Sequence, residues 1–227
     1  MPAVVIRPQK EIQWYVMHYA PEKLKECAEQ IALAGRDLYR RGWTPATSSN
    51  FSMRLDENAC AITISGRHKG ELSAADVMAV DLDGRPLQQA RPSAETLLHT
   101  RLYRRSPDIG AVLHTHSPTA TILTRQRPDA AIVFSGYELQ KAFHGVTSHA
   151  GELVFPVFDN SQDIPELARS VDVWMDEHGT GYGYLIRGHG VYTWGRDMPE
   201  CLRHLEALEF LLECEWRIYS KTAGDQP

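Results

Sequence analysis

Residues 110–118 read GAVLHTHSP and decide how the rest of the chain is interpreted. The compact apolar run over 110–113 predicts a buried strand. Side chains two apart on a strand project from the same face, so the imidazoles of His114 and His116 can converge on one ion. The serine and proline that follow suit the cap and first turn of a helix expected over 117–125. The segment therefore predicts a strand, a histidine pair and a helix in direct succession.

A third histidine, His189, stands between Gly188 and Gly190 at the expected tip of a hairpin. The two glycines let the backbone approach a neighbouring group closely and let the imidazole be aimed freely. Three neutral imidazoles with one open coordination position are the expected ligand set of a catalytic zinc ion, and nitrogen ligands favour zinc over calcium or magnesium. The alternative for His114 and His116 is a pair of half-buried histidines that bind backbone groups.

Helices and short strands alternate along the whole chain. Apolar positions that step by three and four predict a helix over 22–41, which Gly42 ends as the C-cap residue. Further helices are expected over 94–105, with Ser93 as the N-cap, over 164–177 and over 198–220. Further strands are expected over 50–55, 61–64, 77–82, 131–134, 153–157, 183–186 and 191–194. This mixture indicates the α/β class with a largely antiparallel sheet.

Composition excludes several classes of protein. The 227 residues are 43% hydrophobic and 23% charged, as in ordinary globular chains. The net charge of -5, from 24 basic and 29 acidic residues, lacks the basic excess of nucleic-acid-binding proteins. No apolar run approaches the ~18 residues of a membrane span, and residues 1–8 do not resemble a signal peptide. The 4 cysteines form no CxxC pair, which favours reduced core cysteines in a cytoplasmic protein.

Five segments together resemble a known family. They are TSSNFS at 47–52, ITISG at 62–66, RPSAE at 91–95, LHTH at 113–116 and RGHG at 187–190. Their order is that of the class II, zinc-dependent aldolases and their relatives, and the likeness extends from about residue 22 to residue 220. Within this family, GYELQKAF at 136–143 is similar to the methylthioribulose-1-phosphate dehydratase branch of methionine salvage.

The resemblance implies a single α/β/α domain with a central, largely antiparallel sheet. It implies a homotetramer with active sites near the subunit boundaries. It divides the chain into an N-terminal extension (1–21), a catalytic domain (22–220) and a flexible C-terminal tail (221–227). The residues that match the family's zinc ligands, one ion per subunit, are His114, His116 and His189.

The resemblance also implies which residues move protons and which bind the substrate. Glu138 matches the acid/base of the dehydratases, and Glu95 matches the position that touches the metal and moves protons in sugar-phosphate aldolases. A phosphate is bound best by convergent hydroxyls and N–H groups at a helix N-terminus. Lys69 and Arg67 either add positive charge there or lie in an exposed loop. The residues that match the family's phosphate-binding loops are Ser49, where many relatives carry glycine, Asn50, Ser65, Gly66 and Ser93.

The dehydratase branch implies that 5-methylthioribulose 1-phosphate loses water to give 5-methylthio-2,3-diketopentyl 1-phosphate. An aldolase or 4-epimerase that cleaves the C3–C4 bond of a ketose phosphate needs the same sites and remains open, with Glu95 or a tyrosine as its base. A non-catalytic module of this fold would need neither the three histidines nor the acid. His99, one turn after Glu95 on the same helix face, is expected either to bind metal or to form a buried hydrogen bond with Glu95.

Overall fold

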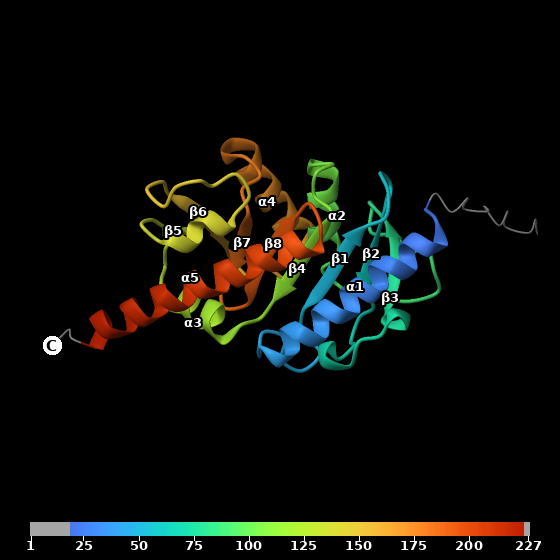
Figure 1. Cartoon of the computed structure of the whole chain (residues 1–227), viewed down its shortest axis with the longest axis horizontal. Coiled ribbons are helices and arrows are strands. Elements are labelled where there is room, and N and C mark those ends of the chain that lie inside the picture. Colours follow the sequence, from blue (N-terminus) through green and yellow to red (C-terminus); the bar gives the residue numbers. More distant parts are fainter. Residues whose placement is uncertain (1–18, 225–227) are drawn as a thin grey trace, which may run out of the picture.

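Eight strands form one sheet in the part of the chain that the structure, a computed structural model, describes (residues 19–224; Figure 1). The strands are β1 (Asn50–Arg54), β2 (Ala59–Thr63), β3 (Val77–Asp81), β4 (Ala111–Thr115), β5 (Ala131–Phe134), β6 (Leu153–Phe158), β7 (Gly183–Ile186) and β8 (Gly190–Gly195). The α-helices are α1 (Pro21–Arg40), α2 (Thr96–Arg105), α3 (Pro118–Gln126), α4 (Ile164–His178) and α5 (Met198–Gly224). Three 3-10 helices, η1 (Lys69–Glu71), η2 (Ala74–Asp76) and η3 (Glu138–Ala142), lie in the connections.

The strand order is β3-β2-β1-β4-β8-β7-β6-β5, and every neighbouring pair is antiparallel except β6 and β7. The predicted α/β class with a largely antiparallel central sheet is confirmed. In the register of the central strands, Asn50 of β1 lies opposite His114 of β4, and Thr115 lies opposite Val191 of β8. This pairing brings the start of β1, the end of β4 and the turn before β8 to one edge of the sheet.

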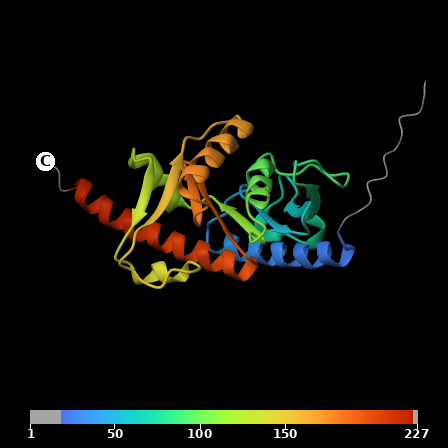
Figure 2. The same cartoon turned by 90° about the horizontal axis from the view of Figure 1, so that it is seen from above.

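Helices cover both faces of the sheet. Figure 2 shows α1 and α5 along one face, with α2 and α4 on the other. Each face has its own apolar core, because strand side chains alternate between the two faces. Ile31 of α1 and Leu208 of α5 belong to the first core, and Leu102 of α2 and Leu167 of α4 belong to the second.

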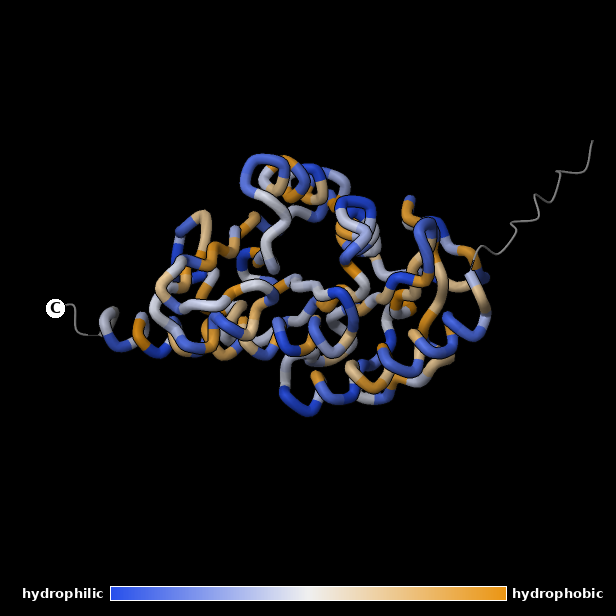
Figure 3. The backbone as a smooth tube through the Cα atoms, turned by 45° about the horizontal axis from the view of Figure 1, so that its top comes forward, coloured by the Kyte–Doolittle hydropathy of each residue, from blue (hydrophilic) through white to orange (hydrophobic). Residues whose placement is uncertain are grey.

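The first helix shows how its sequence pattern sets its position. The tube of α1 alternates between polar and apolar colours along its length (Figure 3), and its apolar positions Cys27, Ile31 and Leu38 are fully buried. Gly42 follows the helix with a φ of 78°, the left-handed conformation that favours glycine. The predicted face and the predicted C-terminal glycine are therefore both confirmed.

Some predicted boundaries differ from the structure. The helix expected from residue 94 begins at Thr96, and α5 continues to Gly224 instead of ending at residue 220. Residues 1–18 and 225–227 lie outside the described part, so most of the extension and the last three residues of the tail stay predictions, as does the domain division. No described helix is long and apolar enough to cross a membrane. The 4 cysteines are free thiols, and Cys27, Cys60 and Cys201 are buried as expected.

Candidate metal centre

The three predicted histidines converge at the edge where β4 and β8 meet. His114 lies within β4, His116 is the first residue after β4, and His189 immediately precedes β8. The ring centroids are 4.5 Å apart for His114 and His116, 5.0 Å for His114 and His189, and 4.5 Å for His116 and His189. One nitrogen of each ring lies within 4.8 Å of the other two, so the three rings can hold one metal ion.

Hydrogen bonds on the far side of two rings leave a lone pair directed into the site. His114 Nδ1 donates to the carbonyl oxygen of Val191 at 2.8 Å, and His189 Nδ1 donates to Oδ1 of Asn160 at 3.1 Å. In a neutral imidazole the other nitrogen is then an acceptor. His114 Nε2 is fully buried and has no hydrogen-bond partner among the described residues.

The electrostatics of these histidines favour the neutral form. Burial, strengthened by the neighbouring histidines, lowers the pKa of His116 to about 3 and lowers the pKa of His114 well below its ordinary value. Burial also lowers the pKa of His189, although Glu95 opposes this. A histidine must be deprotonated to bind a metal, so all three rings are ready for coordination.

The Glu95 carboxylate faces the same point. Its Oε2 lies 3.3 Å from His114 Nε2, and its Oε1 lies 3.4 Å from His189 Nε2. Both imidazole nitrogens carry a lone pair on that side, so acceptor faces acceptor across each gap. A cation bound between them would turn these repulsive contacts into attractive ones. The donor set therefore fits a divalent metal with nitrogen ligands and an adjacent carboxylate.

The local structure explains how Glu95 reaches this point. Ser93 Oγ accepts from the Glu95 N–H at 3.3 Å, and Ser93 O accepts from the Thr96 N–H at 3.2 Å, which forms a turn before α2. Glu95 is the N-cap residue of α2, but its side chain makes no capping bond. The carboxylate instead accepts from Asn50 Nδ2 at 2.7 Å and from the Tyr192 hydroxyl at 3.0 Å. Because the Glu95 side chain points towards the metal centre and does not cap the helix, α2 begins at Thr96 and not at residue 94.

A cleft of about 320 Å³ adjoins the histidines and contains every residue matched to the phosphate-binding loops. Its walls come from the segments before β1, after β2 and before α2, and from the loop before α4. This volume is at the small end of the range for ligand pockets and suits a small sugar phosphate. The residues concerned are Ser49, Asn50, Ser65, Gly66 and Ser93, and Glu95, His116 and His189 line the same cleft.

Two polar groups in this cleft lack ordinary partners. Ser49 adopts a φ of 73°, a conformation that favours glycine, and its buried hydroxyl has no hydrogen-bond partner among the described residues. Lys69 is 1% exposed, and among the described residues its ammonium donates only to the carbonyl oxygens of Arg67 (2.7 Å) and Thr47 (3.3 Å). Burial lowers the pKa of Lys69 to about 8. A free hydroxyl and a cation without a carboxylate partner are the groups that an anion would bind.

The structure shows which of the residues with two possible roles lie at the cleft. Lys69 lines the cleft, whereas the Arg67 side chain is 54% exposed and binds Asp76 at 3.2 Å. His99 is neither a member of the histidine group nor bonded to Glu95, so both expectations for it were wrong. Asn160, which orients His189, was missed because it lies in a loop that carries no motif.

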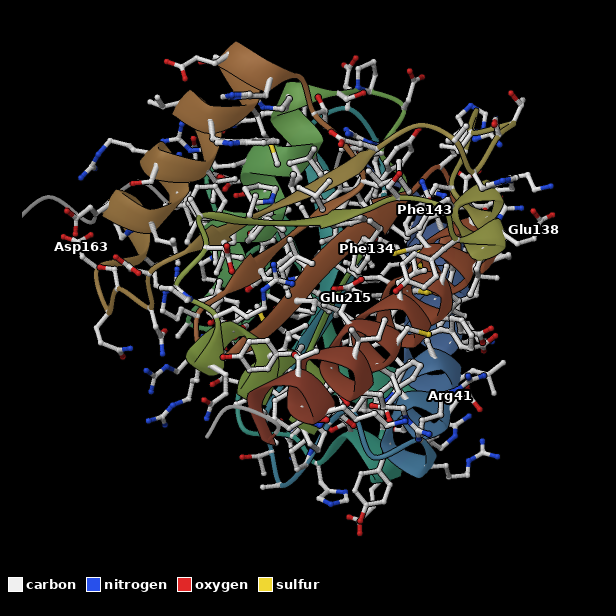
Figure 4. All side chains as sticks on the ribbon, turned by 90° about the vertical axis from the view of Figure 1, so that its left-hand side faces the viewer. Arg41, Phe134, Glu138, Phe143, Asp163 and Glu215 are labelled. Carbon is white, nitrogen blue, oxygen red and sulfur yellow. The ribbon has the colours of Figure 1, made fainter. Side chains whose placement is uncertain are left out.

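Glu138 lies away from the metal centre of its own chain. It begins η3, which packs against α5, and its side chain is 74% exposed. In Figure 4 it points outward at one edge of the molecule, while Asp163, which directly follows cleft residues 160–162, lies at the opposite edge. The hydrogen bond from Lys141 holds the pKa of Glu138 below its ordinary value, so the carboxylate is ionised. Among described residues, Glu138 does not line the cleft.

The sequence profile described as Class II Aldolase and Adducin N-terminal domain matches residues 29–216. This span covers most of the chain and includes the three histidines, Glu95 and Glu138. The chain belongs to the class II aldolase family. The resemblance found in the five sequence segments is therefore confirmed.

Several relatives share more than half of their aligned residues with this chain. A methylthioribulose-1-phosphate dehydratase of Marinobacter nauticus is 60% identical over 190 residues, which cover 83% of this chain and 91% of the relative. Another, of Pseudomonas paraeruginosa, is 56% identical over 197 residues, which cover 86% of this chain and 96% of the relative. Within the class II aldolase family the chain thus groups with the methylthioribulose-1-phosphate dehydratases, as residues 136–143 predicted.

Solved structures confirm the fold at lower sequence identity. The L-fuculose-1-phosphate aldolase from Thermus thermophilus has a TM-score of 0.69 and 24% identity, with 91% of this chain and 98% of that chain covered. A sugar-phosphate aldolase from Thermotoga maritima has a TM-score of 0.65 and 19% identity, with 91% and 97% covered. These likenesses show a shared fold.

Proposed function

We propose that this chain dehydrates 5-methylthioribulose 1-phosphate to 5-methylthio-2,3-diketopentyl 1-phosphate. The observation that carries this proposal is the acceptor-lined gap between Glu95 and the histidines, which opens into a cleft with unpaired anion-binding groups. The named dehydratases at 55–60% identity support the choice of substrate. The four free cysteines and the small-molecule substrate support a cytoplasmic reaction.

The metal in this proposal is one Zn²⁺ per subunit, held by His114, His116 and His189. Three imidazoles with an open position beside a carboxylate suit zinc. When bound, zinc would polarise the C2 carbonyl of the substrate and so make the C3 hydrogen acidic. Val191 and Asn160 fix the ring orientation of two ligands, so little reorganisation is needed on binding.

The substrate phosphate would occupy the outer part of the cleft. Within residues 19–224, Ser49 supplies an unpaired hydroxyl, and the Lys69 ammonium supplies a positive charge with no carboxylate partner. Ser65, Gly66 and Ser93 line the same cleft and complete the proposed phosphate site. Both polar atoms of the Asn50 side chain are engaged by Glu95 and His99, so Asn50 would contact the phosphate through its main chain.

Glu138 is the proposed acid/base, and its position implies that it serves a neighbouring copy. The carboxylate is exposed, does not line the cleft and lies at the edge of the molecule opposite Asp163 (Figure 4), so a homotetramer with sites at the subunit boundaries would bring it to another chain's histidines. Leu139 (37% exposed) and Phe210 (55% exposed) lie together in a groove beside it. Exposed apolar side chains that gather in one groove, rather than lying singly on the surface, are typical of a contact surface.

In this proposal Glu138 moves a proton from C3 of the substrate to the leaving hydroxyl group of C4. Ionised Glu138 takes the C3 proton, and the resulting carboxyl group returns a proton to the C4 hydroxyl as it leaves as water. The enol that remains becomes the 2,3-diketone when its O3 hydroxyl loses a proton and C4 takes one up. Glu95, held rigidly by Asn50 and Tyr192, keeps a fixed negative charge beside the reacting carbonyl and hydroxyl oxygens.

Product analysis tests this proposal directly. Zinc-loaded protein is incubated with 5-methylthioribulose 1-phosphate, and the products are identified by mass spectrometry. Loss of one water, abolished in Glu138→Gln with zinc content unchanged, is the expected result. Dihydroxyacetone phosphate with a methylthio aldehyde would instead indicate C3–C4 cleavage. That alternative is favoured by one observation, the position of Glu95 beside the histidines of its own chain.

A further inference from the structure

A line of hydrogen-bonded side chains runs from the Glu95 carboxylate into the core beneath α2. Asn50 Nδ2 lies 2.7 Å from Glu95 Oε2, and Asn50 Oδ1 contacts His99 Nε2. His99 Nδ1 lies 2.7 Å from Ser52 Oγ, which lies 2.8 Å from the hydroxyl of Tyr103. The four residues behind the carboxylate are buried, with 0–3% exposure.

The ionised carboxylate fixes the direction of every hydrogen bond in this line. Glu95 can only accept, so the amide nitrogen of Asn50 faces it and the amide oxygen faces His99. His99 must therefore carry its hydrogen on Nε2, and its Nδ1 accepts from the Ser52 hydroxyl. Ser52 Oγ in turn accepts from the Tyr103 hydroxyl. Burial lowers the pKa of His99 to about 3, which agrees with a neutral ring.

The line does not lead to solvent, so it cannot carry protons to and from the site. Tyr103 is 2% exposed, and its hydroxyl has no described hydrogen-bond partner besides Ser52. The Arg54 guanidinium lies over the Tyr103 ring, 4.9 Å from the centroid, and its hydrogen bonds go to main-chain oxygens. A closed line of this kind can orient a group but cannot exchange its proton with water.

We propose that His99 is a positioning residue that acts through Asn50 to hold the Glu95 carboxylate at the metal centre. Without the Nε2–H donor the Asn50 amide loses its only described contact on Oδ1 and can rotate. The Asn50 Nδ2 donor would then hold the Glu95 carboxylate less firmly in its place beside His114 and His189. A group that hydrogen-bonds a metal ligand is typically worth 10- to 100-fold in metal affinity or activity, and His99 acts on Glu95 from one residue further back, through Asn50.

His99→Leu and His99→Gln test the proposal as a pair. The Gln amide nitrogen can occupy the place of Nε2 and donate to Asn50, whereas Leu cannot donate at all. We expect His99→Leu to lower kcat by roughly 10- to 100-fold with little change in KM, and to weaken zinc binding against a competing chelator. We expect His99→Gln to recover most of both properties although its thermal stability is also reduced.

Two further variants separate positioning from damage to the core. Tyr184→Phe removes a buried hydroxyl that has no described partner from the same core, and should leave kcat and zinc affinity unchanged. Ser52→Ala removes the donor to His99 Nδ1 with a minimal change of volume, and should act in the same direction as His99→Leu but more weakly. It keeps the test valid if His99→Leu does not fold.

The measurement of activity rests on the proposed function, but the outcomes can separate a failure of that function from a failure of the role inferred for His99. Wild-type kcat and zinc affinity in His99→Leu would overturn it, as would equal losses in His99→Leu and His99→Gln. If the wild-type chain does not dehydrate the substrate, the proposed function fails. The comparison of zinc affinities among the variants still decides the role of His99 in that case.

Discussion

At the scale of single residues, Lys69 is the side chain whose role most needs an explanation. It is 1% exposed, lines the cleft and makes no ion pair with a carboxylate among the described residues. Burial of an unpaired ammonium is costly, and the cost would be offset when a phosphate binds. Lys69→Met should therefore lower kcat/KM for the phosphorylated substrate by roughly 10- to 100-fold, mainly through KM.

The pH dependence of substrate binding checks this role. The pKa of Lys69 is lowered by burial to about 8, so the ammonium is present below that pH and is lost as the pH rises through it. In the wild-type chain KM should rise above about pH 8, whereas in Lys69→Met it should already be high and should vary less. Arg67→Met is the matched control, since Arg67 is exposed and bound to Asp76. A similar loss in both variants would contradict a specific role for Lys69.

The sequence predicted the histidines better than it predicted Lys69. His114 and His116 share a strand face, and His189 has glycine on both sides, so spacing and neighbours alone indicated a metal centre. A lysine in a loop is usually exposed, but this one lies in η1, which packs against α1, and it is buried there. The bond between Asn50 and His99 was equally hidden, because it joins β1 to α2 across 49 residues of sequence.

Most helices and strands were predictable because the spacing of apolar residues within each of them is typical of a helix or of a strand. The exceptions lie where a tertiary contact overrides the local signal. Ser93 is a good N-cap, so the sequence predicts that the helix starts at residue 94. In the structure Ser93 forms a turn that directs Glu95 towards Asn50, and α2 therefore starts at Thr96. Local propensity is a weak prior where a functional group must be placed.

The hairpin glycine Gly190 offers a prediction at the scale of elements. A Cβ at this position would lie 1.9 Å from the carbonyl oxygen of Thr115, where β4 and β8 pair. Gly190→Ala must therefore push the two strands apart next to the metal centre. We expect a loss of about 3 kcal/mol in the free energy of unfolding, since overpacking of this kind typically costs 1–3 kcal/mol or more. Thermal unfolding and zinc binding measure the two consequences.

Gly151→Ala is the control for that substitution. A Cβ at Gly151 would meet nothing within 4 Å, and its φ lies outside the left-handed region. This variant should keep wild-type stability and zinc affinity. Gly190→Ala with an unchanged unfolding midpoint would contradict the close approach of β8 to β4.

For the whole molecule, the sequence could predict the class of the fold but not which elements lie side by side. The parallel pairing of β6 with β7, and the position of η3 against α5, depend on contacts between segments far apart in the chain. The position of η3 matters most, because it leaves Glu138 exposed and outside the cleft that His116 and His189 line. A single chain therefore brings together His114, His116, His189 and Glu95 but not Glu138.

If Glu138 serves a neighbouring copy, two inactive variants should restore activity to each other. Glu138→Gln keeps the histidines and loses the acid, and His116→Ala keeps the acid and loses the metal. In an equal mixture that exchanges subunits, a site needs its histidines from a Glu138→Gln chain (one half) and its acid from a His116→Ala chain (one half). About a quarter of the sites in closed rings should then be complete, with about a quarter of wild-type activity. A double variant that carries both changes, mixed with Glu138→Gln, should restore none. Failure of the two single variants to complement each other, with mixed oligomers demonstrated, would mean that Glu138 acts within its own chain or not at all.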